Sequence, residues 1–238
     1  MLQNSRFLIA LATYNERENL PVLMAQIFEF APDADILIVD DSSPDGTADW
    51  VKEQIQNDSR FHLIKRTGKQ GLGTAVLAAI EYAVQNGYDF LINMDADLSH
   101  LPRFLPAIRA KAEEGFDVVI GSRYVPGGKI KGWTWSRHLM SRAINFYARW
   151  LLGLKTRDNS GSFRCYRVML LRQLDPQSML SRGYSFFEEI LYRLLKLRGT
   201  FAEVPITFEE RQAGQSKLNV KEIFIALWLL LRIGIFKA

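Results

Sequence analysis

The stretch NMDADLSH, residues 93–100, starts as a typical strand and ends on two carboxylates that stand two positions apart. Side chains two apart on a strand point to the same face, so Asp95, Asp97 and Ser99 are predicted to project together. Two carboxylates held this close repel each other unless a cation lies between them. Their oxygens suit Mg²⁺ or Mn²⁺, which often take water and substrate phosphates as further ligands. An Asp-rich turn after a strand is the alternative.

The chain around this stretch alternates apolar runs with helical stretches. Continuous apolar strands between helices are typical of a parallel sheet covered on both faces, and ligands of such α/β proteins bind beyond the carboxyl ends of the strands. The predicted strands are 7–13, 35–40, 61–65, 89–94 and 117–121, and the predicted helices are 17–30, 46–57, 72–86 and 102–114. The strand ends carry Tyr14, Glu16, Asp40, Asp41, Arg66, Asp95, Asp97 and Arg123. These side chains are therefore predicted to converge on one site.

The second half of the chain is less regular. Its predicted elements are helices at 136–154 and 184–198, a strand at 200–211 and a last helix at 219–235. No linker, internal repeat or low-complexity segment interrupts it. We therefore expect an α/β protein with one catalytic domain over residues 1–218, followed by an apolar C-terminal helix over residues 219–238.

Composition and charge restrict the class of partner. The chain has 238 residues, 48% hydrophobic and 24% charged, as in an ordinary globular protein. A net charge of +4 fits anionic substrates, anionic lipid or nucleic acid, but no block of consecutive basic residues favours nucleic acid. The single cysteine, Cys165, excludes an internal disulfide and is predicted to be a small buried side chain.

Two apolar segments point to a membrane surface. The C-terminal run IFIALWLLLRIGIF, residues 223–236, would form a helix about 21 Å long, which is short of the roughly 30 Å needed to cross a bilayer. It is predicted to lie on a membrane or to pack against a partner. The segment SRAINFYARWLLGL, residues 141–154, mixes arginines with aromatic side chains. It fits either an interfacial helix or a core helix with arginines that reach the solvent.

The common phosphate-binding motifs are missing from their expected places. The first predicted strand is followed by ATYNERENL rather than a G-x-G-x-x-G turn, which argues against a dinucleotide oxidoreductase. The GLGTA stretch, residues 71–75, lacks the lysine and spacing of a P-loop. Its glycines either let the backbone approach a ligand or simply start a helix.

A series of motifs along the chain resembles the family 2 glycosyltransferases of the dolichol-phosphate (polyprenyl-phosphate) mannose synthase type. The motifs are ATYNE (12–16), VDDSSPDGT (39–47), GLGTA (71–75), DADLSH (95–100), GSRY (121–124), GYSFFEE (183–189) and EVPITFEERQAGQSKL (203–218). The resemblance implies a GT-A (Rossmann-like) nucleotide-sugar-binding fold with a mostly parallel central sheet and C-terminal interfacial helices. It also implies a nucleotide-sugar donor, Mg²⁺ or Mn²⁺ as cofactor, and a polyprenyl-phosphate acceptor.

The resemblance further implies roles for individual residues. The implied catalytic residues are Asp97, Arg123 and Arg211, and the implied metal ligands are Asp95 and Asp97. The implied donor-binding residues are Ala12, Tyr14, Glu16, Val39, Asp41, Asp95, Ala96, Asp97, Arg123, Arg211 and Lys217, and those for the acceptor phosphate are Arg123, Arg137 and Ser141. Removal of Arg123 is expected to impair catalysis without unfolding the chain.

This sequence departs from the family pattern at a few places. Ala12 stands where the family usually has proline, and Ser99 where many members have glutamine, so Ser99 is not expected to bind the metal. DNSGSFRCYR, residues 158–167, departs from the common D-x-T-S-G-F-R. His100 is predicted to be a solvated loop histidine rather than a ligand.

The reaction implied by the resemblance is an inverting transfer of mannose from GDP-mannose to the lipid phosphate. The acceptor is already anionic at neutral pH, because the second pKa of a phosphate monoester is about 6, so no general base is required. A polyprenyl-phosphate glucosyl or amino-sugar transferase that uses a UDP-sugar is the alternative enzyme. A nucleotide-sugar-binding membrane subunit without turnover is the alternative outside catalysis. We expect peripheral attachment to the cytoplasmic face of a membrane, possible help from a membrane-anchoring partner, and no nucleic acid.

Overall fold

The computed structural model describes residues 5–183, 185–210 and 220–236. Within these residues the main sheet has seven strands in the order β3-β2-β1-β4-β7-β5-β8. The strands are β1 (Phe7–Thr13), β2 (Asp35–Asp40), β3 (Phe61–Lys65), β4 (Phe90–Asp95), β5 (Val118–Ser122), β7 (Arg164–Arg167) and β8 (Phe201–Pro205). All neighbours pair in parallel except β7, which runs antiparallel to both β4 and β5. A small second sheet pairs β6 (Lys129–Lys131) with β9 (Thr207–Glu209).

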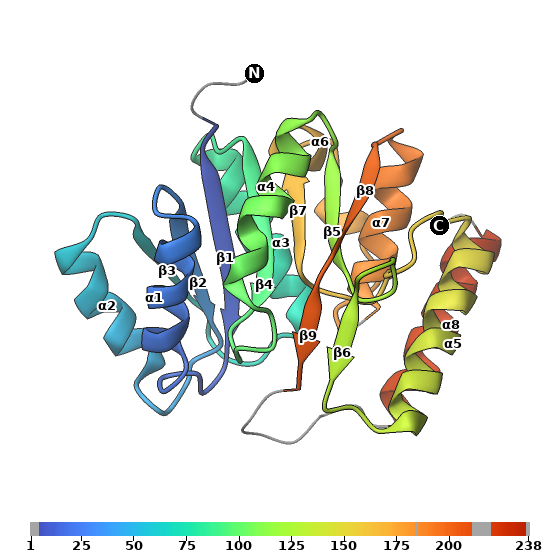
Figure 1. Cartoon of the computed structure of the whole chain (residues 1–238), viewed down its shortest axis with the longest axis horizontal. Helices are drawn as coiled ribbons and strands as arrows, with labels where there is room; N and C mark the ends of the chain where they lie inside the picture. The colour runs from blue at the N-terminus through green and yellow to red at the C-terminus, as the bar shows by residue number, and fades with distance from the viewer. Residues whose placement is uncertain (1–4, 184, 211–219, 237–238) are drawn as a thin grey trace.

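Helices cover both faces of the main sheet (Figure 1). They are α1 (Leu20–Phe30), α2 (Thr47–Asn57), α3 (Leu72–Gln85), α4 (Leu105–Glu113), α5 (Trp135–Leu152), α6 (Val168–Leu171), α7 (Phe186–Lys196) and α8 (Val220–Phe236), with 3₁₀ turns η1 (Pro102–Phe104) and η2 (Pro176–Ser178). Alternation along β1 separates two hydrophobic clusters, because Leu8 and Ala10 join the cluster under α3 and α7 while Ile9 and Leu11 join the one under α1 and α4.

The predicted strands and helices of the first half are confirmed within one to three residues at most ends. Farther along the chain, β6 and α6 were not predicted, and two more differences concern the strands β7 to β9. The short strand β7, RCYR, was not predicted, because it is flanked by arginines and shows no apolar run. The strand predicted at 200–211 is two strands: Ile206 donates its N–H to Ser122 and accepts from Lys129, which passes the chain from β8 in the main sheet to β9 in the second.

The glycines of the GLGTA stretch serve packing between distant parts of the chain. Gly71 has a φ of +98°, and a Cβ there would lie 2.4 Å from the carbonyl oxygen of Arg182. A Cβ on Gly73 would lie 2.7 Å from the ring of Phe186. Glycine therefore lets the segment that leads into α7 cross closely over the first turn of α3.

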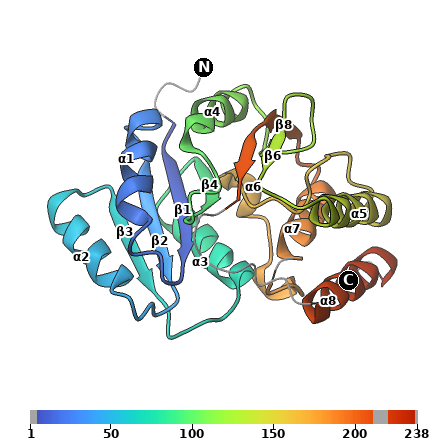
Figure 2. The same ribbon diagram turned by 60° about the horizontal axis from the view of Figure 1, so that its bottom comes forward.

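Helices α5 and α8 lie side by side at one end of the sheet (Figures 1 and 2). Leu230 and Ile233 of α8 are buried in the same hydrophobic cluster as Leu152 of α5. A Cβ on Gly234 would lie 2.6 Å from Cγ of Leu151, so the two helices approach closely at this glycine. Among the described residues, no helix combines the length and apolar character needed to cross a membrane.

Candidate active site

The carboxyl ends of the parallel strands meet at one edge of the sheet, which is the lower edge in Figure 1 and faces the viewer in Figure 2. The pairing register places Ala12 between Val39 on one side and Asp95 on the other. Val39 is buried in the hydrophobic cluster, so only its backbone faces this edge. The convergence of strand ends predicted from the sequence is therefore confirmed.

The predicted donor side of this edge carries two paired cations. Arg66 is largely buried, and its Nε donates to Oδ1 of Asp41 at 2.5 Å while its Nη1 donates to Oγ1 of Thr74 at 2.6 Å. Lys69 places its Nζ 3.4 Å from the centre of the Tyr14 ring. The sequence indicated Arg66 at a strand end but not Lys69, which lies in a loop with no apolar pattern.

Glu16 and its neighbours connect the loop after β1 to the start of α2. The Glu16 carboxylate accepts from Nδ2 of Asn19 at 2.7 Å, and its backbone N–H donates to Oγ1 of Thr47 at 3.2 Å. Asp40 is fully buried and accepts from Oγ1 of Thr13 at 3.0 Å. These contacts fix two neighbouring strand ends relative to each other.

The DADLSH stretch leaves the strand earlier than predicted. β4 ends at Asp95, the next three residues form a bend, and Leu98 has a φ of +63°. The prediction that Asp95, Asp97 and Ser99 share one strand face is therefore wrong. The Ser99 hydroxyl is buried, and the Ser99 N–H donates to Oδ1 of Asp97 at 3.1 Å. The bend, rather than strand alternation, determines where Asp97 lies.

His100 is buried rather than solvated, which corrects the prediction from the sequence. Only 2% of the residue is exposed, and the ring stacks on Phe163 at a centroid distance of 5.1 Å and packs edge-on against Phe208 at 5.5 Å. Burial lowers the pKa of His100. Its Nδ1 accepts the backbone N–H of Asp95 at 3.0 Å, so the histidine supports the end of β4.

Asp95 and Asp97 fit the oxygen ligands of a small divalent cation. Asp95 has a partly exposed side chain, and its Oδ1 accepts from Oγ of Ser162 at 2.7 Å. Nδ1 of His100 lies 3.7 Å from Oδ2 of Asp95 but offers it no proton, because Nδ1 already accepts the Asp95 N–H. In the described part of the chain, no cluster of three or more His, Cys, Asp or Glu side chains is placed to bind a metal. Two carboxylates suffice for Mg²⁺ or Mn²⁺ when phosphates and water complete the shell.

Arg123 forms a buried ion pair that the sequence did not indicate. Its Nε donates to Oδ2 of Asp158 at 2.7 Å and its Nη2 to Oδ1 at 2.6 Å, with 8% and 0% of the two side chains exposed. Burial alone would lower the pKa of Arg123, but the Asp158 carboxylate raises it overall. Arg123 also lies within 5.6 Å of the rings of Trp133 and Phe208. This arginine is thus part of the framework of the site.

Helix α5 carries the residues predicted for the acceptor phosphate, one turn apart. Nη1 of Arg137 donates to Oε1 of Glu210 at 2.5 Å, and its guanidinium lies 4.2 Å from the centre of the Trp133 ring. Oγ of Ser141 accepts from the hydroxyl of Tyr124 at 2.7 Å. The other predicted phosphate-binding residues, Arg211 and Lys217, lie outside the described residues.

The loop at 158–162 joins these parts of the site. Besides the Asp158 contact with Arg123, Oγ of Ser160 accepts from Nη2 of Arg123 at 3.1 Å. Buried Asn145 of α5 accepts the N–H of Asn159 at 2.6 Å and donates from Nδ2 to Ser160 at 3.1 Å. One loop therefore contacts Asp95, Arg123 and helix α5. The local sequence offers one signal of this connection: Asn145 is a polar residue on the side of α5 that faces the protein interior.

Glu188 is a buried carboxyl group behind this loop. It lies in the first turn of α7 and is 3% exposed, and its Oε2 has no hydrogen-bond partner among the residues that the structure describes. Burial raises the pKa of Glu188 to about 7. Nearby Arg164 is fully buried and donates to the carbonyl oxygens of Phe187 and Asn159 at 2.6 and 2.5 Å.

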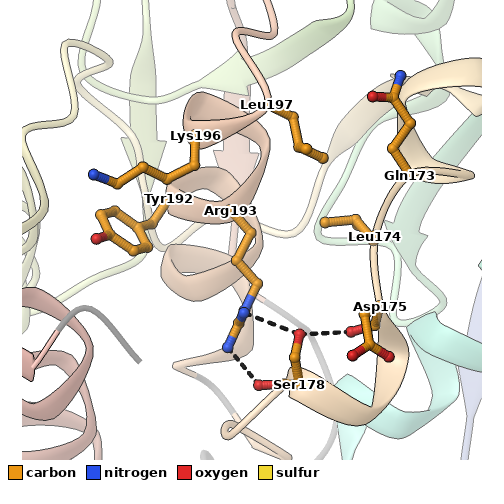
Figure 3. Close-up of a pocket in the computed structure, with 8 residues that line it drawn as sticks. All are labelled: Gln173, Leu174, Asp175, Ser178, Tyr192, Arg193, Lys196 and Leu197. Carbon is orange, nitrogen blue, oxygen red and sulfur yellow. Dashed lines mark hydrogen bonds between the residues drawn. The ribbon is translucent and has the colours of Figure 1, made fainter.

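A pocket of about 440 Å³ lies away from the strand ends, between α7 and the segment after α6 (Figure 3). Its lining residues are Gln173, Leu174, Asp175, Ser178, Tyr192, Arg193, Lys196 and Leu197. Nε of Arg193 donates to Glu189 at 2.8 Å, and its Nη1 donates to Oγ of Ser178 at 3.0 Å. None of the predicted site residues in the described part of the chain lines this pocket, so the candidate site stays at the strand ends.

Comparisons with known proteins show which family the chain resembles. Residues 8–175 match the family described as Glycosyl transferase family 2. The chain is 40% identical to the polyprenol monophosphomannose synthase of Mycolicibacterium smegmatis, over 97% of this chain and 87% of that protein. It is 42% identical to the undecaprenyl-phosphate mannosyltransferase of Micrococcus luteus, over 90% of this chain and 88% of that protein.

Solved structures share the fold at low sequence identity. Glucosyl-3-phosphoglycerate synthase from Mycobacterium tuberculosis, in complex with Mn²⁺, UDP and glucosyl-3-phosphoglycerate, has a TM-score of 0.67 and 16% identity, over 95% of this chain and 77% of that one. A mannosyltransferase from Pyrobaculum calidifontis, in complex with GDP-Man and Mn²⁺, has a TM-score of 0.59 and 15% identity, over 90% of this chain and 59% of that one. The predicted GT-A fold is therefore confirmed.

Proposed function

The chain belongs to glycosyltransferase family 2, and we propose that it transfers mannose from GDP-mannose to a polyprenyl phosphate, giving polyprenyl-phosphate mannose and GDP. The observation that carries this choice is the identity of 40% and 42% to two transferases whose names specify a mannosyl group and a polyprenol or undecaprenyl acceptor. The match extends over 97% and 90% of this chain, so it is not confined to one part of the fold.

The proposed reaction is a single displacement at the anomeric carbon. A lipid-phosphate oxygen attacks, the bond to the diphosphate breaks, and the sugar inverts. The nucleophile is already ionised at neutral pH, since its second pKa is about 6. A general base is then unnecessary, which agrees with a buried, neutral His100 beside the strand end.

Asp95 and Asp97 are the proposed metal ligands. A divalent cation held there would neutralise charge on the leaving diphosphate. The residues themselves provide a preformed arrangement: Ser162 and His100 hold Asp95, and the N–H of Ser99 holds Asp97. Mg²⁺ and Mn²⁺ are the cations expected, because both accept carboxylate and phosphate oxygens in an octahedral shell.

Arg137 and Ser141 are proposed to bind the acceptor phosphate. They lie one turn apart on α5, close to the Arg123 and Asp158 pair through Tyr124 and Ser160. Arg137 would exchange its contact with Glu210 for the phosphate, with which a guanidinium also forms charge-assisted, often bidentate hydrogen bonds. Arg211 and Lys217 remain proposed donor-phosphate residues.

A lipid acceptor brings the protein to a membrane, and α5 and α8 supply a suitable surface. The outer faces of both helices expose large apolar side chains: Trp135, Leu139, Phe146, Trp150, Ile225, Trp228, Leu231 and Ile235. Helix α5 adds Arg142 and Arg149, both exposed, and contains no acidic residue. Aromatic and cationic side chains on one face are typical of helices that lie in the membrane interface. We propose peripheral attachment through this surface; a cytoplasmic location and a membrane-anchoring partner stay predictions.

Radiolabelled donors test the proposal directly. Purified protein is incubated with polyprenyl phosphate, Mg²⁺ or Mn²⁺, and one of GDP-mannose, UDP-glucose or UDP-N-acetylglucosamine, and label in the organic phase is counted. We expect label from GDP-mannose alone, and none without the lipid phosphate. Label from a UDP-sugar would assign the alternative transferase, and no label from any donor that the protein binds would assign a subunit without turnover.

A further inference from the structure

Ser162 makes a contact with the proposed metal site that the sequence did not reveal. Its Oγ donates to Oδ1 of Asp95 at 2.7 Å, and the residue is 7% exposed. The backbone is fixed as well, because the carbonyl oxygen of Ser162 accepts from Nδ2 of Asn93 in β4 at 2.9 Å. The hydroxyl is therefore held against one oxygen of Asp95 by a rigid part of the sheet.

This contact makes the two carboxylate oxygens of Asp95 different. Oδ1 accepts a hydrogen bond from the hydroxyl group of Ser162. Oδ2 lies 3.7 Å from Nδ1 of His100, which accepts the Asp95 N–H and so has no proton to give. Oδ2 consequently keeps its lone pairs for a cation, while Oδ1 is partly committed to the protein.

The difference matters for the choice of metal. Mg²⁺ and Mn²⁺ bind carboxylates well through a single oxygen in an octahedral shell, whereas Ca²⁺ takes six to eight oxygens and often uses both oxygens of one carboxylate. We propose that Ser162 is a positioning residue that restricts Asp95 to binding through Oδ2 and thereby makes the site favour Mg²⁺ and Mn²⁺ over Ca²⁺. The inference rests on the proposed metal role of Asp95.

Substitutions of Ser162 can either remove or keep its hydroxyl group. Glycine offers no donor to Asp95. Ser162→Gly is thus a natural second variant beside Ser162→Ala, and Ser162→Thr keeps the hydroxyl.

Binding of Mn²⁺ to the protein with GDP, followed by electron paramagnetic resonance, tests the proposal without any turnover. Outer-shell partners of metal ligands typically change metal affinity by roughly 10- to 100-fold. We expect Ser162→Ala and Ser162→Gly to bind Mn²⁺ about tenfold more weakly and to release it at a lower ratio of Ca²⁺ to Mn²⁺ than the wild type. Ser162→Thr keeps the hydroxyl group and should therefore show the Mn²⁺ affinity and the Ca²⁺ competition of the wild type. A purely structural role of Ser162 would not predict this result.

Thermal unfolding of each variant shows which of them are folded under the conditions of the titration. The proposal is overturned if either folded variant, alanine or glycine, keeps the Mn²⁺ affinity and Ca²⁺ competition of the wild type, or if the wild type with GDP binds no Mn²⁺. A wild type that binds Mn²⁺ as expected but does not transfer mannose would contradict the proposed function and leave the role of Ser162 standing.

Discussion

Arg123 illustrates how burial changes the expected effect of losing a single residue. Its ion pair with Asp158 is almost inaccessible to solvent. Arg123→Ala would leave a buried carboxylate without its partner, which typically costs about 3 to 5 kcal/mol. We therefore expect a large loss of stability, measured as the free energy of unfolding in urea, in place of the purely catalytic defect predicted from the sequence.

An exposed ion pair provides the control. Lys52 and Asp49 pair on α2 with 54% and 73% of their side chains exposed. Lys52→Ala should change the free energy of unfolding far less than Arg123→Ala does, because solvent screens an exposed ion pair. If Arg123→Ala and Lys52→Ala have the same free energy of unfolding, burial of the Asp158 carboxylate does not require Arg123. The ion pair then does not stabilise the fold as inferred.

Glu188 predicts a pH dependence of stability. Its pKa rises from 4.5 in the unfolded chain to about 7 in the fold because of burial. As the pH rises between these values, the unfolded state loses its proton first, so folding becomes less favourable; above pH 7 the penalty is complete. Below 4.5 both states keep the proton and the group has no effect. The shift corresponds to a penalty of about 3 kcal/mol at pH 8.

Glu188→Gln should therefore stabilise the protein at pH 8 and change little at pH 5. Urea unfolding at the two pH values measures this, with Glu29→Gln on the exposed side of α1 as a control that should behave like the wild type. An equal effect of Glu188→Gln at both pH values would show that its carboxyl has the same pKa in the folded and unfolded states.

At the scale of elements, continuous apolar strands were predictable and the irregular connections were not. β1, β2, β4 and β5 are buried on both faces, so their sequences read as unbroken apolar runs. β7 lies between β4 and β5 in the sheet, but it contains the charged Arg164 and therefore does not look like a buried strand in the sequence. Arg164 can be buried because it donates to the carbonyl oxygens of Phe187 in α7 and of Asn159 in the loop before β7, and no local sequence pattern reveals these acceptors.

Helices α5 and α8 carry the membrane prediction. Phe146 and Trp150 are 69% and 74% exposed on α5. Burial of a large apolar side chain contributes about 1.5 to 3 kcal/mol, so Phe146→Ser with Trp150→Ser should weaken binding to vesicles of phosphatidylglycerol and phosphatidylcholine at least tenfold. Sedimentation with vesicles measures this, and higher salt should weaken wild-type binding further.

The matched control is Met169→Ser on α6, also exposed but on another part of the molecule. It should leave vesicle binding unchanged. Equal binding by the α5 variant and the wild type would remove α5 from the membrane surface. Deletion of 223–238 is a poor test, because it removes Leu230 and Ile233 from the hydrophobic cluster and is expected to destabilise the chain. The predicted division at residue 218 stays a prediction.

For the whole molecule, the sequence indicated at which end of the sheet the site lies, but not which contacts hold the parts of the site together. Parallel strand ends meet by topology, so the convergence of Tyr14, Asp41 and Asp95 followed from periodicity alone. The loop at 158–162 binds partners in other elements, as between Ser162 and Asp95 of β4 or between Asn159 and Asn145 of α5. These contacts depend on the antiparallel insertion of β7, which was not predicted.

The central claim is that this fold uses Asp95 and Asp97 to support mannosyl transfer to a lipid phosphate. The most direct measurement is the rate of mannose transfer from GDP-mannose to polyprenyl phosphate by the wild type and by Asp97→Asn, each with Mn²⁺ and with EDTA. Removal of a metal ligand should lower the rate of mannose transfer more than removal of an outer-shell residue does. We therefore expect the rate to fall more than about 100-fold in the variant, and by a similar factor for the wild type in EDTA. Transfer that persists in both cases would contradict the account.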